Sequence, residues 1–304
     1  MLGVCLLGCG GMTPLPERRL SSLLLKHNGK MILVDCGEGT QIGIKKLGWG
    51  FKSIEAVCLT HYHADHVAGL PGFLLTLGNS DRTEPLTIFG PPPLELVVRA
   101  LTVIAPQLPY DIKLVELSEQ RESYEKIGEL SIKAMPMEHR IPCLAYSFEL
   151  SRAGKFDVAA AESLGIPKEY WNPLQKGKTI EYKGRTLVPE LFMGPPREGL
   201  KVTYSTDCRP TETLLEFCRN SDLLICEGMY ADDRLLEKAK ERKHMIFSEA
   251  ANLALNSGAK ELWLTHFSPS LKNPQDYISI PQSIFPNTVI GEELLTKELN
   301  FKDK

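Results

Sequence analysis

Four side chains of the types that bind metal ions lie within six consecutive residues. The segment HYHADH contains His61, His63, Asp65 and His66. It follows the apolar segment 55–60 (EAVCLT), which predicts a buried β-strand, so His61 and His63 can point to the same side of an extended strand end. Asp65 and His66 follow a turn, at the start of a predicted helix. Imidazole and carboxylate together favour zinc, with manganese or iron as alternatives.

Four candidate ligands in one short segment exceed the three protein ligands that a catalytic zinc ion usually has. Two metal ions that share the segment explain the excess if distant residues complete each coordination shell. His139 follows one predicted strand, His266 ends another, and Asp207 lies in the segment YSTDCRP. Such strand ends are where α/β folds build sites. The alternatives are a run of surface histidines that binds nothing and, for His139 or His266 alone, a structural histidine.

The elements that must position these residues alternate along the chain. Strands are predicted at 4–8, 22–27, 30–35, 55–60, 85–90, 113–117, 124–128, 130–136, 143–150, 201–206, 222–227 and 261–266. Helices are predicted at 41–47, from near Asp65 to 77, and through 212–220, 231–242 and 247–257. Strand and helix alternation in both halves indicates an α/β sandwich whose halves are similar.

Residues 151–190 differ from the rest of the chain and predict an insertion that projects from the core. They show no sustained periodicity. Their basic residues outnumber their acidic ones: Arg152, Lys155, Lys168, Lys176, Lys178, Lys183 and Arg185 stand against Asp157, Glu162, Glu169 and Glu181.

Composition limits the remaining possibilities. With 304 residues, 43% hydrophobic and 24% charged, the chain has the composition of a soluble globular protein of one large domain or two ordinary ones. No apolar run has the length of a membrane span, and the start MLGVCLLGCGG reads as a strand, not as a signal peptide. Its glycines lack the spacing of a dinucleotide site and predict a turn that brings backbone close to the site.

A net charge of −3 argues against a general nucleic-acid coat protein. The eight cysteines contain no CxxC pair, which favours reduced, buried thiols of a cytoplasmic protein.

Several segments together resemble the ribonuclease Z family of the metallo-β-lactamase superfamily, in its short form. The similarity runs essentially end to end, through LVDCGEGTQ (33–41), HADHVAGLPGFLLTL (63–77), HRIPCLAYSFE (139–149), GKFDVAAAESLGIP (154–167), MGPP (193–196), YSTDCRP (204–210), LTHFSP (264–269) and FPNTVIGEELLTKEL (285–299). The resemblance implies a single domain over 1–304 with a four-layer αββα sandwich. It also implies that 151–190 is an inserted arm that serves as a tRNA-binding exosite.

The same resemblance assigns roles to particular residues. It implies that His61, His63 and His139 bind one zinc ion, that Asp65, His66 and His266 bind the other, and that Asp207 bridges them. Asp65 is also the family's proposed general base. Glu227 and His244 match a pair that protonates the leaving group.

The expected function is therefore a zinc-dependent endoribonuclease that hydrolyses a phosphodiester at the 3′ end of pre-tRNA. Two Zn²⁺ ions per subunit, or Mn²⁺ or Fe in their place, would ionise a shared water to the hydroxide nucleophile. The family implies a homodimer, and no membrane partner is expected. Candidates for phosphate contacts are Arg18, Arg19, Lys45, Lys46, Arg242, Lys243 and the arm lysines. Tyr170 and Trp171 either stack on bases or pin the arm to the body of the protein.

Departures from the family pattern keep other functions open. The arm lacks the usual Gly-x-Pro element, and Ala64, Arg19 and the sequence after His244 differ from the family's residues. One alternative is a dinuclear hydrolase of a small phosphodiester or other ester, with an altered arm. A non-catalytic RNA-binding scaffold and an oxygen-reducing di-iron protein are further alternatives.

Overall fold

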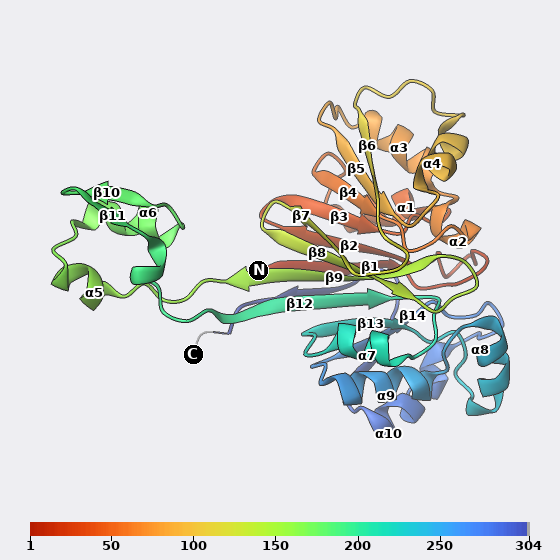
Figure 1. Cartoon of the computed structure of the whole chain (residues 1–304). Coiled ribbons are helices and arrows are strands. Elements are labelled where there is room, and N and C mark those ends of the chain that lie inside the picture. Colours follow the sequence, from red (N-terminus) through yellow and green to blue (C-terminus); the bar gives the residue numbers. More distant parts are fainter. Residues whose placement is uncertain (303–304) are drawn as a thin grey trace. The chain divides into compact units, whose positions relative to one another are not determined.

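The computed structural model describes residues 1–302, and the chain forms two compact units (Figure 1). Unit 1 contains residues 1–149 and 200–300, and unit 2 contains residues 150–199 together with the segment that begins at Phe301. Each unit has a hydrophobic core of its own. The predicted insertion at 151–190 lies within unit 2.

The first of two seven-stranded sheets in unit 1 has the order β16-β1-β2-β3-β4-β5-β6. Its strands are β1 (Leu2–Gly8), β2 (Ser22–His27), β3 (Lys30–Val34), β4 (Ile54–Cys58), β5 (Leu86–Gly90), β6 (Ile112–Glu116) and β16 (Leu295–Leu299). Pairing is antiparallel from β16 to β3 and parallel from β3 to β6.

The second sheet has the order β15-β14-β13-β12-β9-β8-β7. Its strands are β7 (Ser123–Ile127), β8 (Leu130–Met137), β9 (Cys143–Arg152), β12 (Arg197–Ser205), β13 (Leu223–Glu227), β14 (Leu262–Thr265) and β15 (Thr288–Ile290). The strands from β12 to β15 are parallel, whereas β7, β8 and β9 are antiparallel. Each sheet therefore has one parallel part.

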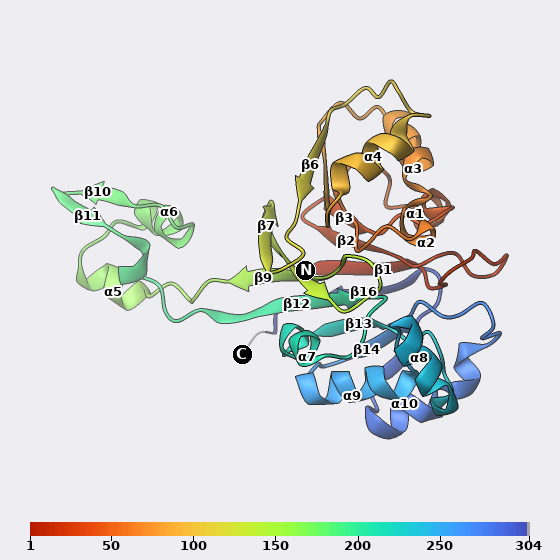
Figure 2. The ribbon, with the colours of Figure 1, turned by 45° about the vertical axis from the view of Figure 1, so that its right-hand side comes forward.

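Helices connect the parallel strands, because parallel neighbours need crossover connections. Those of the first sheet are α1 (Thr40–Leu47), α2 (Ala64–Val67), α3 (Leu70–Gly78) and α4 (Leu94–Thr102). Those of the second are α7 (Glu212–Cys218), α8 (Leu236–Arg242), α9 (Phe247–Ser257) and α10 (Ser279–Ile284), with 3-10 turns η3 (Asp233–Leu235) and η4 (Pro274–Tyr277). Figure 2 shows α3 and α4 outside the first sheet and α9 and α10 outside the second. This is the predicted four-layer sandwich.

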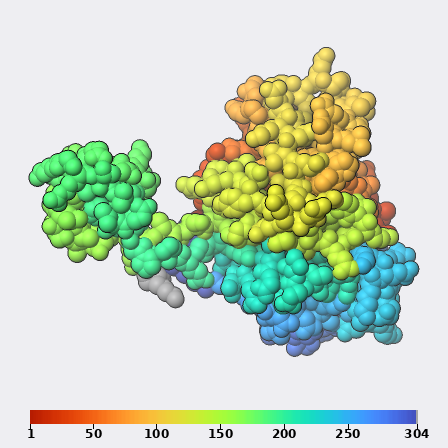
Figure 3. Space-filling view, viewed as in Figure 1, coloured from red at the N-terminus to blue at the C-terminus, as the bar shows by residue number. Residues whose placement is uncertain are grey.

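The core of the first half lies between its sheet and its helices. Leu24, Leu33 and Val57 of the strands are buried against Ile44 of α1 and Phe73 of α3. Burial of side chains like these stabilises the fold by about 1.5–3 kcal/mol each. Figure 3 shows that the red-to-yellow, yellow-green, teal and blue segments of unit 1 adjoin one another without a break in that view.

Unit 2 is built from short elements around a small core. They are α5 (Val158–Ser163), η1 (Lys168–Tyr170), α6 (Trp171–Gln175), β10 (Ile180–Tyr182), β11 (Arg185–Leu187) and η2 (Pro189–Leu191). The buried residues are Ala161, Ile166, Leu174, Leu187 and Phe192. The Asp157 side chain accepts a hydrogen bond from the Ala160 amide at 2.9 Å and so caps α5. Sequence periodicity misses these elements because each is only a few residues long.

Two further findings on the described residues concern the cysteines and the helices. All eight cysteines are free and buried, as predicted. No helix of residues 1–302 has both the length and the apolarity to cross a membrane. In unit 1, the elements α4, α10, β15 and β16 were not among the predicted ones.

Candidate metal centre

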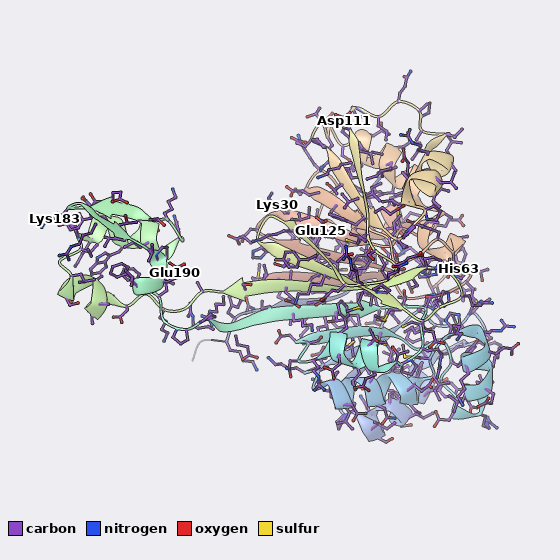
Figure 4. All side chains as sticks on the ribbon, in the orientation of Figure 1. Lys30, His63, Asp111, Glu125, Lys183 and Glu190 are labelled. Atoms are coloured by element: carbon purple, nitrogen blue, oxygen red, sulfur yellow. The ribbon has the colours of Figure 1, made fainter. Side chains whose placement is uncertain are left out.

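The candidate ligands lie at the carboxyl ends of parallel strands from both sheets. His61 comes shortly after β4, Asp207 shortly after β12, and His266 directly after β14. The carboxyl ends of parallel strands point to one edge of a sheet, and ligand sites of α/β folds form there. In Figure 4, His63 lies at this edge and Lys30, at the start of β3, lies toward the opposite one.

Three residues at this edge have a left-handed backbone conformation that side chains other than glycine rarely adopt. The φ angle is +57° for Asp35, +21° for Asp207 and +58° for His266. They follow β3, β12 and β14 respectively. Such conformations cost about 1–3 kcal/mol each and persist only where the surroundings impose them. Their concentration at one edge marks it as a candidate functional site.

The first group of donors consists of His61, His63, His139 and Asp207, whose ligand atoms all lie within 4.8 Å of one another. His63 Nδ1 lies 3.0 Å from His61 Nε2 and 3.4 Å from His139 Nε2. Asp207 Oδ2 lies 3.6 Å from His61 Nε2 and 3.9 Å from His139 Nε2. Three histidine nitrogens and one carboxylate oxygen therefore face a common point.

The second group consists of Asp65, His66 and His266, again within 4.8 Å of one another. The Nε2 atoms of His66 and His266 are 3.2 Å apart. Asp65 Oδ2 lies 3.5 Å from His66 Nε2 and 3.4 Å from His266 Nε2. The other carboxylate oxygen of Asp207, Oδ1, lies 3.3 Å and 3.0 Å from the same two nitrogens. Asp207 thus belongs to both groups, one oxygen to each.

These separations fit a divalent cation. Tetrahedral zinc with nitrogen or oxygen ligands at 2.0–2.1 Å sets neighbouring donors roughly 3.3 Å apart. Asp207 Oδ1 is buried and has no hydrogen-bond partner among the described residues, and a buried carboxylate oxygen is costly without a proton donor or a cation. The division of Asp207 between the groups allows one cation for each.

The protonation states of the histidines also favour a metal. Burial lowers the pKa of His61, of His63 and of His139, for the last to about 4. These rings are therefore neutral at pH 7, and neutral imidazole is the form that binds metals. His66 differs, because Asp35 and Asp207 raise its pKa in spite of its burial. At His66 a proton and a cation compete for Nε2.

His244 and Glu227 form a buried pair beside these groups. His244 Nδ1 lies 2.9 Å from Glu227 Oε2, and Glu227 Oε1 accepts a hydrogen bond from the Cys208 amide at 2.6 Å. Burial alone would lower the pKa of His244, but the Glu227 carboxylate raises it above the ordinary value. His244 Nδ1 is also 4.0 Å from Asp207 Oδ2, so His244 is close enough to join the donors.

The structure thus brings together all of the predicted site residues. These are His61, His63, Asp65, His66, His139, Asp207, His266, His244 and Glu227. His27, the remaining histidine of the chain, pairs instead with Glu129 at 2.9 Å. The metal-binding and catalytic roles of the assembled residues stay predictions.

Asp35 is a candidate site residue that sequence reasoning missed. It is fully buried at the end of β3, where its Oδ2 lies 2.8 Å from His66 Nδ1. The Thr60 amide donates to Asp35 Oδ1 at 2.8 Å, and the Thr60 hydroxyl donates at 2.9 Å to Oδ2. This carboxylate fixes the ring of His66 and leaves Nε2 free for a metal. The available signal was an acid at the end of an apolar strand, in LVDCGEGTQ.

The glycine-rich turn after β1 lies against the centre, as predicted. A Cβ atom on Gly11 would stand 2.7 Å from the ring of His266, closer than real Cβ atoms come to other atoms. The next residue, Met12, donates its amide to Asp65 Oδ2 at 2.6 Å. Only glycine lets the backbone approach closely enough to make this contact.

Several basic residues predicted as phosphate contacts have partners within the protein. Arg18 is buried and donates to the carbonyl groups of Leu271 and Lys272 at 2.9 Å each. Arg19 pairs with Glu293 at 2.7 Å. Lys243 pairs with Glu138. These three side chains support loops in the structure and are not free cations.

The aromatic pair of the predicted arm also has internal partners. Trp171 donates its indole N–H to the Ile166 carbonyl at 2.9 Å and lies 5.6 Å from the Phe156 ring between centroids. Tyr170 lies 5.4 Å from Tyr182. Both residues pack on the core of unit 2 and so stabilise that unit itself, which is neither of the two predicted roles.

Comparisons with known proteins agree with this geometry. The family model described as the metallo-beta-lactamase superfamily matches residues 16–137. A Ribonuclease Z of Agathobacter rectalis is 53% identical over 303 residues, with 100% of each chain covered. A Ribonuclease Z of Clostridium acetobutylicum is 50% identical over 308 residues, again with 100% of each chain covered. The crystal structure of human tRNase Z, short form, aligns with a TM-score of 0.69 at 24% identity and covers 98% of this chain and 100% of that one.

The sandwich and its histidine-rich edge define a metallo-β-lactamase-fold enzyme. At half of all positions or more over its whole length, the chain is identical to proteins named Ribonuclease Z. It belongs to the ribonuclease Z family. The predicted family and the expectation of a metal-dependent hydrolase of the ribonuclease Z type are confirmed.

Proposed function

We propose that this chain is an endoribonuclease that hydrolyses a phosphodiester at the 3′ end of pre-tRNA, using two Zn²⁺ ions. The observation that carries the proposal is the pair of donor groups that share the two oxygens of Asp207, in a chain of the ribonuclease Z family. Relatives with that name and the structural likeness to human tRNase Z support pre-tRNA as the substrate.

Seven side chains would hold the cations. The first group is His61, His63 and His139, the second is Asp65, His66 and His266, and Asp207 joins the two. A pair of bound divalent cations lowers the pKa of water toward neutrality and neutralises phosphate oxygens. Histidine and carboxylate ligands favour zinc, and Mn²⁺ and Fe suit the same set less strongly.

Asp65 is suited to receive a proton. It is nearly buried, and the neighbouring His266 and His66 lower its pKa in spite of that burial. It therefore stays an ionised carboxylate, held in place by the Met12 amide. An ionised carboxylate at this position can accept a hydrogen bond from the attacking water and take its proton.

His244 is suited to give a proton. Glu227 holds Nδ1 at 2.9 Å, so the opposite ring nitrogen, Nε2, is left for the substrate. Because Glu227 raises the pKa of His244, the ring carries a proton further into the neutral range. Transfer of that proton to the departing 3′-oxygen of the tRNA completes the hydrolysis and leaves a 3′-hydroxyl.

Cleavage of a pre-tRNA transcript with a 3′ trailer tests the proposal. The wild type, Asp65→Ala and His244→Ala are compared after loading with zinc, and the metal content of each is measured. Asp65→Ala should lose nearly all activity together with bound metal. His244→Ala should keep its metal and lose about 10²–10⁴-fold in rate. Equal activity of all three would refute the site assignment.

The same assay with bis(p-nitrophenyl) phosphate distinguishes the alternative function. The altered arm sequence motivates a hydrolase of small phosphodiesters. Turnover of the small diester without any cleavage of pre-tRNA would favour that alternative and contradict the proposed one. Absence of both activities, with less than one metal equivalent bound after zinc loading, would favour the non-catalytic scaffold.

Two further expectations from the family complete the proposal. We expect a homodimer, which light scattering on the purified protein measures directly. We also expect a cytoplasmic enzyme, which cell fractionation tests.

A further inference from the structure

Arg140 is a cation beside the metal centre to which the roles above assign nothing. It follows His139 directly, beyond the end of β8, and its side chain is exposed. Among residues 1–302 its guanidinium group makes no hydrogen bond or ion pair. This exposed arginine has no partner and lies next to a candidate metal-binding residue. It is therefore available to bind a group of the substrate.

The backbone around Arg140 is fixed at the rim of the centre. The Arg209 amide donates to the Glu138 carbonyl at 3.2 Å, and Lys243 pairs with the Glu138 side chain. His139 Nδ1 lies 3.3 Å from the Lys243 carbonyl. These contacts tie residues 138 and 139 to the loop after β12 and to the loop that carries His244, so Arg140 starts from a defined position.

The neighbours of His139 locate that position further. The ring centroid of His139 lies 5.1 Å from that of His63 and 5.5 Å from that of His244. Arg140 therefore directly follows a residue whose ring neighbours both the first metal group and the ring of His244.

The charge of Arg140 reaches side chains from three other segments. Burial is the main cause of the lowered pKa of His63, and Arg140 adds to it. Burial raises the pKa of Tyr230, and Arg140 opposes that rise. For His244 it opposes the rise caused by Glu227. These effects agree with the place of Arg140 directly after His139.

Four other cations of unit 1 are already engaged. Arg209 forms a double ion pair with Glu249, and Arg18, Arg19 and Lys243 have the partners described above. Their charges are balanced within the protein or held by carbonyl groups, whereas the charge of Arg140 is not.

We propose that Arg140 binds the RNA phosphate adjacent to the scissile one. The inference rests on the proposed function, since a polynucleotide has such a phosphate and a small diester has none. The planar guanidinium group matches two phosphate oxygens at once, which makes arginine better suited than lysine to this role. Arg140 is thus a residue that distinguishes polynucleotides from small diesters.

Substitution at Arg140 tests the inference on two substrates. Zinc-loaded wild type, Arg140→Ala, Arg140→Lys and the control Arg99→Ala, at an exposed arginine on α4, are assayed with pre-tRNA and with bis(p-nitrophenyl) phosphate. Arg140→Ala should lower kcat/KM for pre-tRNA about tenfold or more, the size of a charge-assisted hydrogen bond. Turnover of the small diester should change less than about twofold. Arg140→Lys should recover part of the loss, and Arg99→Ala should match the wild type.

The salt dependence supplies a readout that misfolding does not imitate. Loss of one phosphate contact should reduce the slope of log KM for RNA against log salt by about 0.7–0.9. An unchanged slope and unchanged pre-tRNA cleavage by Arg140→Ala would overturn the inference while the proposed function stands. Equal losses on both substrates would also overturn it. A wild type that cleaves no pre-tRNA would instead refute the proposed function itself.

Discussion

The four carboxylates of the centre have unequal surroundings, and these decide what each can do. Asp207 Oδ1 has no hydrogen-bond partner among the described residues, which suits a ligand shared by two cations. Asp35 is saturated by Thr60 and His66 and so can only orient a ligand. Asp65 is bound by one backbone amide, and Glu227 is paired with His244. Chemically identical groups thus acquire separate roles from their contacts.

Removal of the negative charge at Asp35 should weaken metal binding without touching a ligand. Asp35→Asn loses the charge that holds His66, and loss of such an outer contact costs about 10–100-fold in metal affinity. Zinc titration against a competing chelator measures the effect. The control is Asp111→Asn, at an exposed acid directly before β6. Unaltered affinity in Asp35→Asn would show that Asp35 does not support the ligand.

The charge of Glu227 should set the alkaline limit of activity. Glu227 raises the pKa of His244, so Glu227→Gln lowers that pKa, and the acid form of the ring is lost at a lower pH. The alkaline limb of the kcat profile for pre-tRNA should move to lower pH by roughly 1–3 units. The exposed acid Glu216 provides the control Glu216→Gln. A limb that stays in place would argue against His244 as the proton donor.

At the scale of elements, local pattern predicted most strands and the segment HYHADH but not how they meet. Strands such as β3 and β13 contain the continuous apolar runs MILV and LLIC, which are recognisable in isolation. His266 lies 200 positions from His66, and only the parallel order of strands brings the two together. That pairing came from the family resemblance. Asp35 was missed because its role depends on residues that follow the neighbouring strand β4. The elements of unit 2 were missed because they are too short to show a periodic pattern.

The turn after β1 should tolerate no side chain at Gly11. Gly11→Ala would press a methyl group against the ring of His266, 2.7 Å away, and displace a ligand of the second group. We expect reduced zinc content and a large loss of activity, measured by metal analysis and cleavage assay. Gly194→Ala, where the nearest atom is 3.4 Å away, should behave as the wild type. Full zinc content in Gly11→Ala would contradict the predicted close approach.

The small core of unit 2 should depend on Trp171. Trp171→Ala removes the indole contact to Phe156 and the hydrogen bond to Ile166, at a cost of about 2–4 kcal/mol for a half-buried tryptophan. Hydrogen exchange should rise across residues 156–192, and pre-tRNA cleavage should fall while small-diester turnover stays. Leu191→Ala, at a side chain that is 58% exposed, is the control. Unchanged exchange would show that this core does not need the indole.

At the scale of the whole molecule, the centre joins strands from both sheets, so its cations should stabilise unit 1 as a whole. A cation that binds the folded chain and not the unfolded one adds RT ln(1 + [L]/Kd), about 2.7 kcal/mol at a concentration of 100 Kd. Chelation should therefore lower Tm by several degrees, and zinc should restore it. The same treatment of Asp207→Ala should change Tm little. Equal shifts in the two proteins would mean that the cations bind elsewhere.

Anomalous diffraction at the zinc edge, from crystals of the zinc-loaded protein, tests the central claim most directly. We predict two peaks per chain, one among His61, His63 and His139 and the other among Asp65, His66 and His266, with one oxygen of Asp207 on each. A single peak, or zinc bound away from Asp207, would contradict the account.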